Sequence, residues 1–232
     1  MNRTDDELLK IKEIAFIGKV TASISHEIKN VLATINELSG LVGDLLNKGD
    51  QNTPPNFTRV AQLNINTQEQ VKRGAEIVKR LNRFAHSMDE NASYSDLNDI
   101  VILTADVAKR LARLKGVSLE VIPTNKPIID LNSYPFKIEQ ILFGCIEYLL
   151  NISEKKSLIT IAVKQNEVDS SITISDDSSN ANPSFGCDVT EETSDLQIVF
   201  LKTLMNEIGG SVNFTQSQSG NTIILSIPLK PP

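Results

Sequence analysis

A histidine followed directly by a glutamate, His26 and Glu27, lies within a long amphipathic segment. A helix turns about 100° per residue, so the imidazole points about 200° away from the hydrophobic residues Ile24 and Ile28 and should face solvent. A free imidazole, with an ordinary pKa of about 6.5, is largely neutral at pH 7 and is then a nucleophile. Glu27 could accept the proton of one ring nitrogen and leave the other nitrogen free to attack.

The neighbours of His26 favour contact with another protein. Ala22 and Ala33 lie near the same helix face and are small, while Lys29 and Asn30 are polar. We therefore expect a partner to dock around Ala22, Lys29 and Ala33 and to bring a phosphoryl group to the imidazole. An ordinary surface histidine is the alternative that helix position alone would favour.

The elements that must hold this histidine are two predicted long helices. Hydrophobic residues recur at steps of three and four along residues 5–48 and again along 57–91. In the second helix the predicted hydrophobic stripe consists of Val60, Leu63, Val71, Val78, Leu81, Ala85 and Met88. Gly and a Pro pair occupy the connection, so residues 1–93 should form an antiparallel helical hairpin. One hairpin buries little apolar surface, and we expect two copies to form a four-helix bundle, which makes the protein a homodimer.

Residues 94–232 predict a second domain of α+β class. Alternating hydrophobic and polar residues indicate strands, and longer periodic segments indicate helices. The expected helices span about 96–115, 130–153 and 194–208, and the expected strands span 117–123, 157–165, 170–175, 210–216 and 221–229. The first of these helices should end at Lys115, with Gly116 as its C-cap. The domain should be an α/β sandwich with helices on one face of a mixed sheet.

The composition excludes several classes of protein. A net charge of −6 argues against a nucleic-acid-binding protein. No apolar run reaches the roughly 18 residues that a membrane span needs, and the charged N-terminus lacks the apolar region of a signal peptide. We therefore expect a cytoplasmic protein. The two cysteines, Cys145 and Cys187, have no metal-ligand spacing and should be inert.

The sequence SHEIKN at residues 25–30 resembles the phosphoacceptor box of bacterial two-component histidine kinases. EIVKRLNRFA is similar to their second bundle helix, and KPIIDLNSYPFKIEQIL and IGGSVNFTQSQSGNTIILSIPL follow the order of their ATP-binding domain. The resemblance implies a dimerisation and histidine phosphotransfer (DHp) hairpin followed by a histidine kinase ATPase domain of the GHKL, or Bergerat, type. It implies that His26 is phosphorylated, that Glu27 aids autophosphorylation, and that Asn30 helps to orient water when such a protein acts as a phosphatase.

The ATP-binding site departs from this resemblance. The family carries two asparagines four residues apart on one helix, and the second helps to hold magnesium; the corresponding residues here are Gly144 and Tyr148. The family's next box has an aspartate that reads adenine, followed by spaced glycines. The chain keeps Asp176 there but has Ser178 and Asn180 at the glycine positions, where a side chain restricts the backbone.

A third family box, normally rich in glycine, falls on Glu191, Thr193 and Asp195. Two like unit charges 4 Å apart repel by about 4 kcal/mol at an effective dielectric of 20, so acids here oppose triphosphate binding. The structural alternatives are that these acids and Glu192 complement the dipole at a helix start, and that Asp176 lies in a solvated turn. The vestigial ATP site should thus comprise Gly144, Tyr148, Asp176, Glu191 and Asp195, with no bound cofactor.

These features together predict a histidine phosphotransferase with a degenerate ATP-binding domain. It would pass a phosphoryl group between receiver-domain aspartates of response regulators through His26, with Mg²⁺ supplied by the partner's receiver domain. It would therefore be a phosphotransferase rather than an ATP-dependent kinase. A divergent active sensor kinase, a non-catalytic protein that binds a kinase or regulator, and a phosphatase that uses Asn30 remain alternatives. His86, near a helix end and without an adjacent acid, is not the expected acceptor.

Overall fold

The computed structural model shows an α+β protein. It describes residues 3–47, 56–89, 93–122, 124, 129–166, 169–178, 185, 196–217 and 220–229. By its internal contacts the chain divides into two compact units, one formed by Gly18–Ala85 and the other by Met1–Ile17 together with His86–Pro232. No helix in the described part of the chain is both long enough and apolar enough to cross a membrane.

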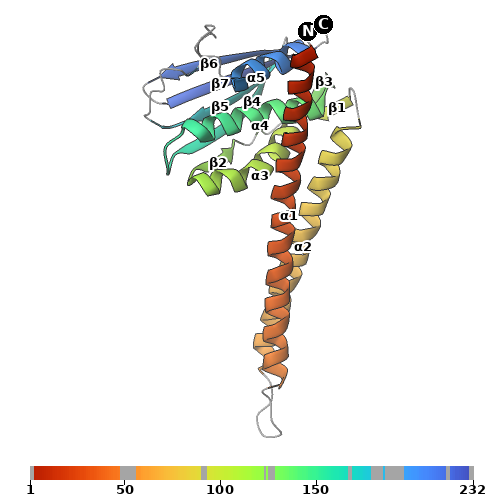
Figure 1. The fold of residues 1–232 in the computed structure, drawn as a ribbon. Coiled ribbons are helices and arrows are strands. Elements are labelled where there is room, and N and C mark those ends of the chain that lie inside the picture. Colours follow the sequence, from red (N-terminus) through yellow and green to blue (C-terminus); the bar gives the residue numbers. More distant parts are fainter. Residues whose placement is uncertain are drawn as a thin grey trace. The chain divides into compact units, whose positions relative to one another are not determined.

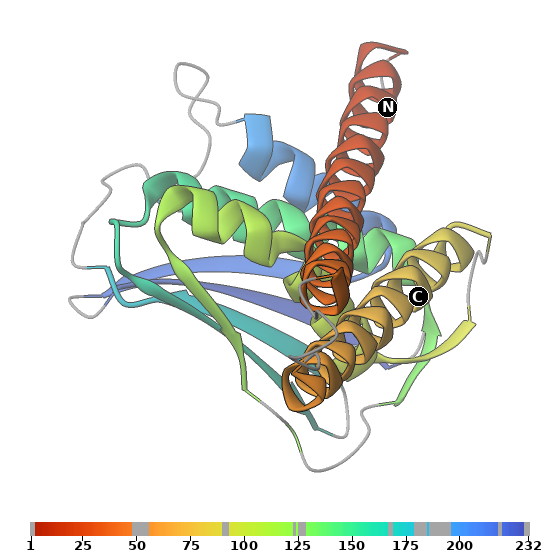
Figure 2. The ribbon, with the colours of Figure 1, turned by 90° about the horizontal axis from the view of Figure 1, so that it is seen from below.

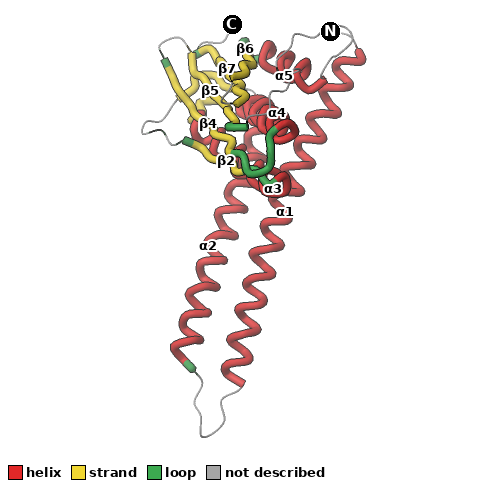
Figure 3. The backbone as a smooth tube through the Cα atoms, turned by 90° about the vertical axis from the view of Figure 1, so that its left-hand side faces the viewer, coloured by secondary structure: helices red, strands yellow, loops and turns green. Residues whose placement is uncertain are grey.

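The first unit is a helical hairpin, as predicted. Helix α1 (Arg3–Asn47) and helix α2 (Phe57–Ser87) run antiparallel and side by side (Figures 1 and 3). The second helix ends at Ser87, a few residues before the predicted end. The two helices approach closely at Gly74, where an added Cβ atom would lie 3.3 Å from Cγ1 of Val31. The small residue therefore permits this approach.

The buried face of α2 agrees with the predicted stripe at Leu63 but is shifted by one residue at Ile77 and Phe84. Leu63, Ile77 and Phe84 are buried, whereas Val71 and Val78 are 56% and 46% exposed. The predicted members Ala85 and Met88 are exposed as well, and Val60 and Leu81 are partly buried. Helix α2 carries two neighbouring apolar lines, and periodicity alone does not tell which of them faces α1.

The second unit is an α/β sandwich, also as predicted. Helices α3 (Leu97–Lys115), α4 (Pro135–Ile152) and α5 (Leu196–Glu207) cover one face of a five-stranded sheet (Figure 2). The strand order is β2-β4-β5-β7-β6, and the sheet is mixed because β2 and β4 are parallel while the other pairs are antiparallel. The strands are β2 (Ser118–Val121), β4 (Leu158–Gln165), β5 (Asp169–Asp176), β6 (Ser211–Ser217) and β7 (Gly220–Pro228).

Local sequence signals explain where the helices of this unit begin and end. Asp96 caps α3 by accepting a hydrogen bond from the backbone N–H of Asn98. Gly116 ends α3 in the left-handed conformation, with φ of 73°, as predicted. Alternate residues of the central strands, such as Ile161, Ile174 and Ile223, are fully buried beneath the helices.

A small second sheet corrects the prediction of one long helix over residues 130–153. Strand β1 (Ser93–Asp96) pairs antiparallel with strand β3 (Ile129–Ser133), which takes up the start of that segment. Helix α4 begins only at Pro135, because proline has no N–H to donate and is favoured in the first turn of a helix. Strand β1 has four residues and β3 has five, too few for periodicity alone to separate them from the neighbouring helices.

The start of α1 packs within this second unit. Phe16 is buried, and its ring centroid lies 5.7 Å from that of Phe136 and 5.1 Å from that of Phe143, both on α4. At the end of α2, the Ser87 hydroxyl donates a 2.8 Å hydrogen bond to the buried carboxylate of Glu139. These contacts explain why the compact units divide at 17/18 and 85/86, whereas the sequence suggested a domain boundary at 93/94.

Candidate functional site

His26 lies on the hairpin unit, near the middle of α1. Its side chain is exposed, whereas Ile24 is buried, so the imidazole faces solvent as the helical spacing predicts. Ala22, Lys29 and Ala33, the residues expected to contact a partner, are exposed too. The imidazole is therefore accessible to a reactant carried by another molecule.

Asn30 is the residue that contacts the imidazole. Its side-chain amide nitrogen lies 3.2 Å from Nδ1 of His26, one helical turn earlier. Residues four apart face each other on a helix surface, so this pair follows directly from the sequence spacing. The contact engages Nδ1, the ring nitrogen nearer the main chain, and the nitrogen on the other side of the ring is Nε2.

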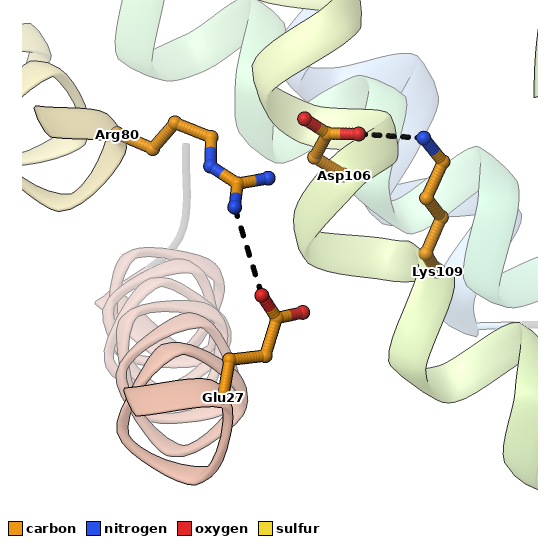
Figure 4. Close-up of polar contacts among 4 residues, drawn as sticks. All are labelled: Glu27, Arg80, Asp106 and Lys109. Atoms are coloured by element: carbon orange, nitrogen blue, oxygen red, sulfur yellow. Dashed lines mark hydrogen bonds and ion pairs between the residues drawn. The ribbon is translucent and has the colours of Figure 1, made fainter. Parts of the chain in front are cut away.

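Glu27 lies elsewhere than the sequence interpretation expected. Its carboxylate pairs with the guanidinium of Arg80 on α2 at 3.6 Å. Figure 4 draws this ion pair, and it also draws the pair that Asp106 and Lys109 form on α3. Adjacent residues on a helix point about 100° apart, so a carboxylate at 27 does not face the ring at 26. Among the described residues, the polar partner of the ring is Asn30 and not Glu27.

Arg80 was not among the residues singled out from the sequence. Its side chain is 28% exposed and that of Glu27 is 15% exposed, so the pair is partly buried between the two helices. The available signal was a basic residue between the buried positions Ile77 and Phe84 on the inner side of the second helix. Such a residue needs an acid from the opposite helix, because burying an unpaired charge is costly.

Gly144 supports close packing of two helices in the α/β unit. An added Cβ atom would lie 2.9 Å from Cδ2 of Leu201 on α5, and Leu201 is fully buried. The side-chain amide of Gln197 also donates a 2.9 Å hydrogen bond to the carbonyl oxygen of Gly144. Helix α5 thus lies against the position where the resemblance expects an asparagine side chain.

Replacing Gly144 with asparagine should lower the free energy of unfolding by about 1–3 kcal/mol, because the new side chain overpacks against Leu201. Urea unfolding would measure the change. Gly40→Ala is the matched control: Gly40 lies within α1 with no atom near its missing Cβ, so alanine there should stabilise by about 0.5–1 kcal/mol. Equal stability of Gly144→Asn and the unmodified protein would show that the side chain of Leu201 can shift to admit the asparagine with no loss of unfolding free energy.

Tyr148, one turn further along α4, is part of an aromatic cluster. Its side chain is 4% exposed, and its ring centroid lies 5.9 Å from that of Phe185 and 6.0 Å from that of Phe214. The rings of Phe185 and Phe214 also meet, at 5.7 Å and nearly perpendicular. Aromatic pairs at these distances are mutually stabilising, so Tyr148 serves the packing of this unit.

Asp176 lies at the end of β5 and is buried, which corrects the alternative of a solvated turn. One carboxylate oxygen accepts hydrogen bonds from the hydroxyls of Ser153 and Ser178, at 2.6 and 2.8 Å. The other accepts from the backbone N–H and the side-chain amide of Asn221, at 2.8 and 3.2 Å. The carboxylate is therefore satisfied by protein donors on both oxygens. The next residue, Asp177, is exposed.

Gly220 makes this arrangement possible. Its φ is 127°, and an added Cβ atom would collide with the carbonyl oxygen of Asp176. Glycine alone tolerates both the backbone conformation and the close approach. The start of β7, which carries Asn221, can therefore come close enough to bind the aspartate.

Several predicted residues of the ATP site lie outside the described residues: Asn180, Glu191, Glu192, Thr193 and Asp195. Cys187 lies outside them too. Cys145 is a free cysteine buried in α4, and burial raises the pKa of its thiol, so the thiol is protonated and unreactive at neutral pH. Among the described residues, no three His, Cys, Asp or Glu side chains are grouped so that they could hold a metal ion.

Comparison with known proteins gives the relatives of this chain. No protein-family model matches it. The chain is similar to the C4-dicarboxylate transport sensor protein DctB of Rhizobium meliloti (strain 1021), with 22% identity over 243 residues. The match covers 98% of this chain and 37% of DctB, so the chain spans little more than a third of that relative's length.

Solved structures show which fold the chain shares. The nucleotide-free catalytic domain of histidine kinase ThkA aligns with a TM-score of 0.53 and 13% identity, covering 62% of this chain and all of that domain. A complex of ThkA with the response regulator protein TrrA aligns over 97% of this chain and 67% of that one, at a TM-score of 0.49 and 15% identity. The likeness to the ThkA catalytic domain establishes that the chain has the fold of a histidine kinase catalytic domain.

Proposed function

We propose that the chain is a histidine phosphotransfer protein of a two-component phosphorelay, which receives and donates phosphoryl groups at His26 without using ATP itself. The observation that carries the proposal is a contrast between two parts of the chain. The imidazole of His26 is exposed on the hairpin, whereas Gly144, Tyr148 and Asp176 are engaged in packing and hydrogen bonding within the α/β unit. The chain thus offers a phosphate acceptor while the residues that would bind nucleotide are occupied by other contacts.

The transfer step needs only a nucleophile and a phosphorylated partner. The lone pair of a ring nitrogen of neutral His26 attacks the phosphorus of an aspartyl phosphate on a receiver domain. The bond from phosphorus to the aspartate oxygen breaks, and its electron pair leaves with the carboxylate. The partner's receiver domain would supply Mg²⁺ to neutralise the phosphoryl charge, and the hairpin would supply the position of the imidazole.

The residues around His26 fit a docking surface for such a receiver. Ala22 and Ala33 are exposed and small, so a partner can approach the helix closely. Lys29 is exposed and positively charged, which complements an acidic phosphorylation site. We expect the receiver to contact α1 through these three residues.

A homodimer is part of the same proposal. On α2, Val71 and Val78 are seven residues apart and largely exposed, and on α1 Leu32 and Leu41 are 59% and 43% exposed. One hairpin leaves these side chains in water. A second hairpin would cover them and complete a four-helix bundle.

A divergent kinase is the second candidate, favoured by the complete α/β layer. The five strands of the main sheet and the three helices that cover it are present, with the fold of the ThkA catalytic domain. Such a protein would bind ATP with Mg²⁺ and phosphorylate its own His26. The buried, fully hydrogen-bonded state of Asp176 weighs against this candidate.

Nucleotide titration separates the two candidates. Isothermal calorimetry of the full chain with ATP and Mg²⁺ should give no heat of binding up to millimolar nucleotide, and incubation with radiolabelled ATP should leave the protein unlabelled. Incubation with the phosphorylated receiver domains of the host should label it. Micromolar ATP binding followed by self-labelling would replace the proposal with the kinase. If none of the phosphorylated receiver domains labels the protein, the remaining candidate is a non-catalytic binding protein.

A further inference from the structure

The end of α3 and the turn between α4 and β4 together form a strongly basic surface. Arg113 and Lys115 lie in the last turn of α3. Lys155 and Lys156 lie in the turn, whose backbone meets the end of α3. The N–H of Lys156 donates a 2.7 Å hydrogen bond to the carbonyl oxygen of Gly116, and an added Cβ atom on Gly116 would lie 3.7 Å from Cγ of Lys155. We call these four cationic residues the basic patch.

The charges of the basic patch are not neutralised by the described part of the chain. All four side chains are exposed, and none of them forms an ion pair with a described residue. One acid, Glu154, lies beside Lys155 in the same turn, so positive charge remains in excess. The chain as a whole carries a net charge of −6, and the basic patch is therefore a local reversal of its charge.

The backbone of Lys156 indicates that its side chain has a role outside the fold. Its φ is 73°, in the left-handed region, and among the described residues no other residue except glycine has a positive φ. Glycine adopts this conformation without strain, whereas lysine does not. The turn holds the strained backbone in place, since the Ser157 hydroxyl donates a 2.8 Å hydrogen bond to the carbonyl oxygen of Glu154. Strain of this kind is typical of positions with a function.

An exposed leucine accompanies these cations. Leu114 lies between Arg113 and Lys115 in the last turn of α3 and is 71% exposed. It therefore contributes little to the core of the α/β unit. Cations around an exposed apolar side chain are typical of segments that lie on an anionic membrane surface, where the apolar group enters the headgroup region and the cations attract the lipid phosphates.

We propose that the basic patch and Leu114 form a docking surface for an anionic lipid bilayer. No helix in the described part of the chain can cross a membrane, so the contact is a peripheral one. The leucine enters the boundary between headgroups and acyl chains, and the cations lie over the lipid phosphates. The remaining surface is acidic overall and is repelled by the same lipids, which orients the molecule with the basic patch toward the bilayer. This docking is independent of phosphoryl transfer at His26.

The side chains of the basic patch fit lipid better than they fit an acidic protein. Protein interfaces are enriched in arginine and depleted in lysine, and leucine is under-represented among their energetic anchors. Three of the four cations here are lysines, which are compact charges on flexible stems and reach phosphate groups without a fixed geometry. Only Arg113 could make the bidentate contact by which a folded protein's carboxylate is recognised.

Co-flotation of the full chain with lipid vesicles tests the proposal. The chain should float with vesicles of phosphatidylglycerol and phosphatidylcholine in equal parts, and it should stay behind with vesicles of phosphatidylcholine alone. Added salt should weaken the binding, because salt screens exposed charges. Each cation replaced by a neutral residue should lower the partition coefficient about fivefold. Leu114→Asn should lower it by up to about tenfold.

Lys156→Gly separates docking from folding. Glycine relieves the left-handed backbone, so this variant should unfold at a temperature no lower than the unmodified protein. Its binding to the anionic vesicles should nevertheless be about fivefold weaker. Lys164→Gln is the matched control, because Lys164 is an exposed lysine on β4 outside the basic patch, and its replacement should leave vesicle binding unchanged.

Two results would overturn the proposal. Equal flotation of the unmodified protein and of a variant that combines Lys155→Gln with Lys156→Gly would show that another part of the chain binds the lipid. Failure of the unmodified protein to float with the anionic vesicles would exclude a lipid surface, and slower phosphoryl uptake by the same variant would then assign the basic patch to an acidic protein. If docking is to lipid, phosphoryl uptake in solution should be equal in the variant and the unmodified protein, so the flotation result stands whether or not His26 accepts phosphate.

Discussion

Replacing His26 with alanine is expected to abolish phosphoryl uptake from every receiver domain that labels the unmodified protein. The imidazole is the proposed nucleophile, so its removal leaves no atom to form the phosphorus–nitrogen bond. The residue is exposed, and surface substitutions usually change stability by no more than about 0.5 kcal/mol. The loss should therefore appear without unfolding. Autoradiography after incubation with a phosphorylated receiver measures it, and circular dichroism checks the fold.

His86→Ala is the matched control for this experiment. His86 is also exposed and lies near the end of α2, where its ring is 3.4 Å from the carboxylate of Asp89. This variant should accept phosphate at the unmodified rate. Label retained in His26→Ala and lost in His86→Ala would move the acceptor to His86. Full biological activity of His26→Ala would instead favour the non-catalytic binding protein.

Replacing Asp176 with alanine should lower the free energy of unfolding by about 3 kcal/mol, because it leaves several buried donors without an acceptor. Ser178 and Asn221 are almost fully buried, so water does not replace the carboxylate readily. The loss of unfolding free energy in Asp176→Asn should be smaller than in Asp176→Ala, since the amide keeps one acceptor oxygen. Chemical denaturation followed by circular dichroism measures both changes.

The competing interpretation of Asp176 makes the opposite prediction. If its carboxylate read adenine, alanine would weaken nucleotide binding and leave stability nearly unchanged. Asp44→Ala provides the control, because Asp44 is an exposed acid on α1, and its replacement should change stability by less than about 0.5 kcal/mol. A stability loss in Asp176→Ala no greater than in this control would show that Asp176 does not stabilise the fold. Phosphoryl uptake at His26 should persist in Asp176→Ala at temperatures where it stays folded.

Features set by local spacing were predictable from the sequence. The exposure of His26, the hairpin helices and the alternating strands each follow from periodicity over a few turns or residues. The contact between Asn30 and His26 is of the same kind, because a spacing of four on a helix brings side chains together. The sequence interpretation paired the ring with the adjacent acid, Glu27, which helical geometry turns away from it.

Features that join distant segments were not predictable. Asp176 receives its hydrogen bonds from Ser153, 23 positions earlier, and Asn221, 45 positions later. The pairing of Glu27 with Arg80 and the pairing of β1 with β3 likewise depend on how separate elements meet. On α2 the sequence holds two adjacent apolar lines, and the choice between them is made by α1 and not by α2 itself. Propensity and spacing describe one segment at a time and leave these choices open.

The contact between Gly144 and Leu201 also constrains how this protein can evolve. An asparagine at position 144 needs a smaller residue at 201, but shrinking a fully buried leucine alone costs about 2–5 kcal/mol. Each substitution is therefore harmful on its own, and only the pair together could be neutral. Such mutual dependence separates the two arrangements by a stability barrier, because either substitution made first lowers the stability of the fold.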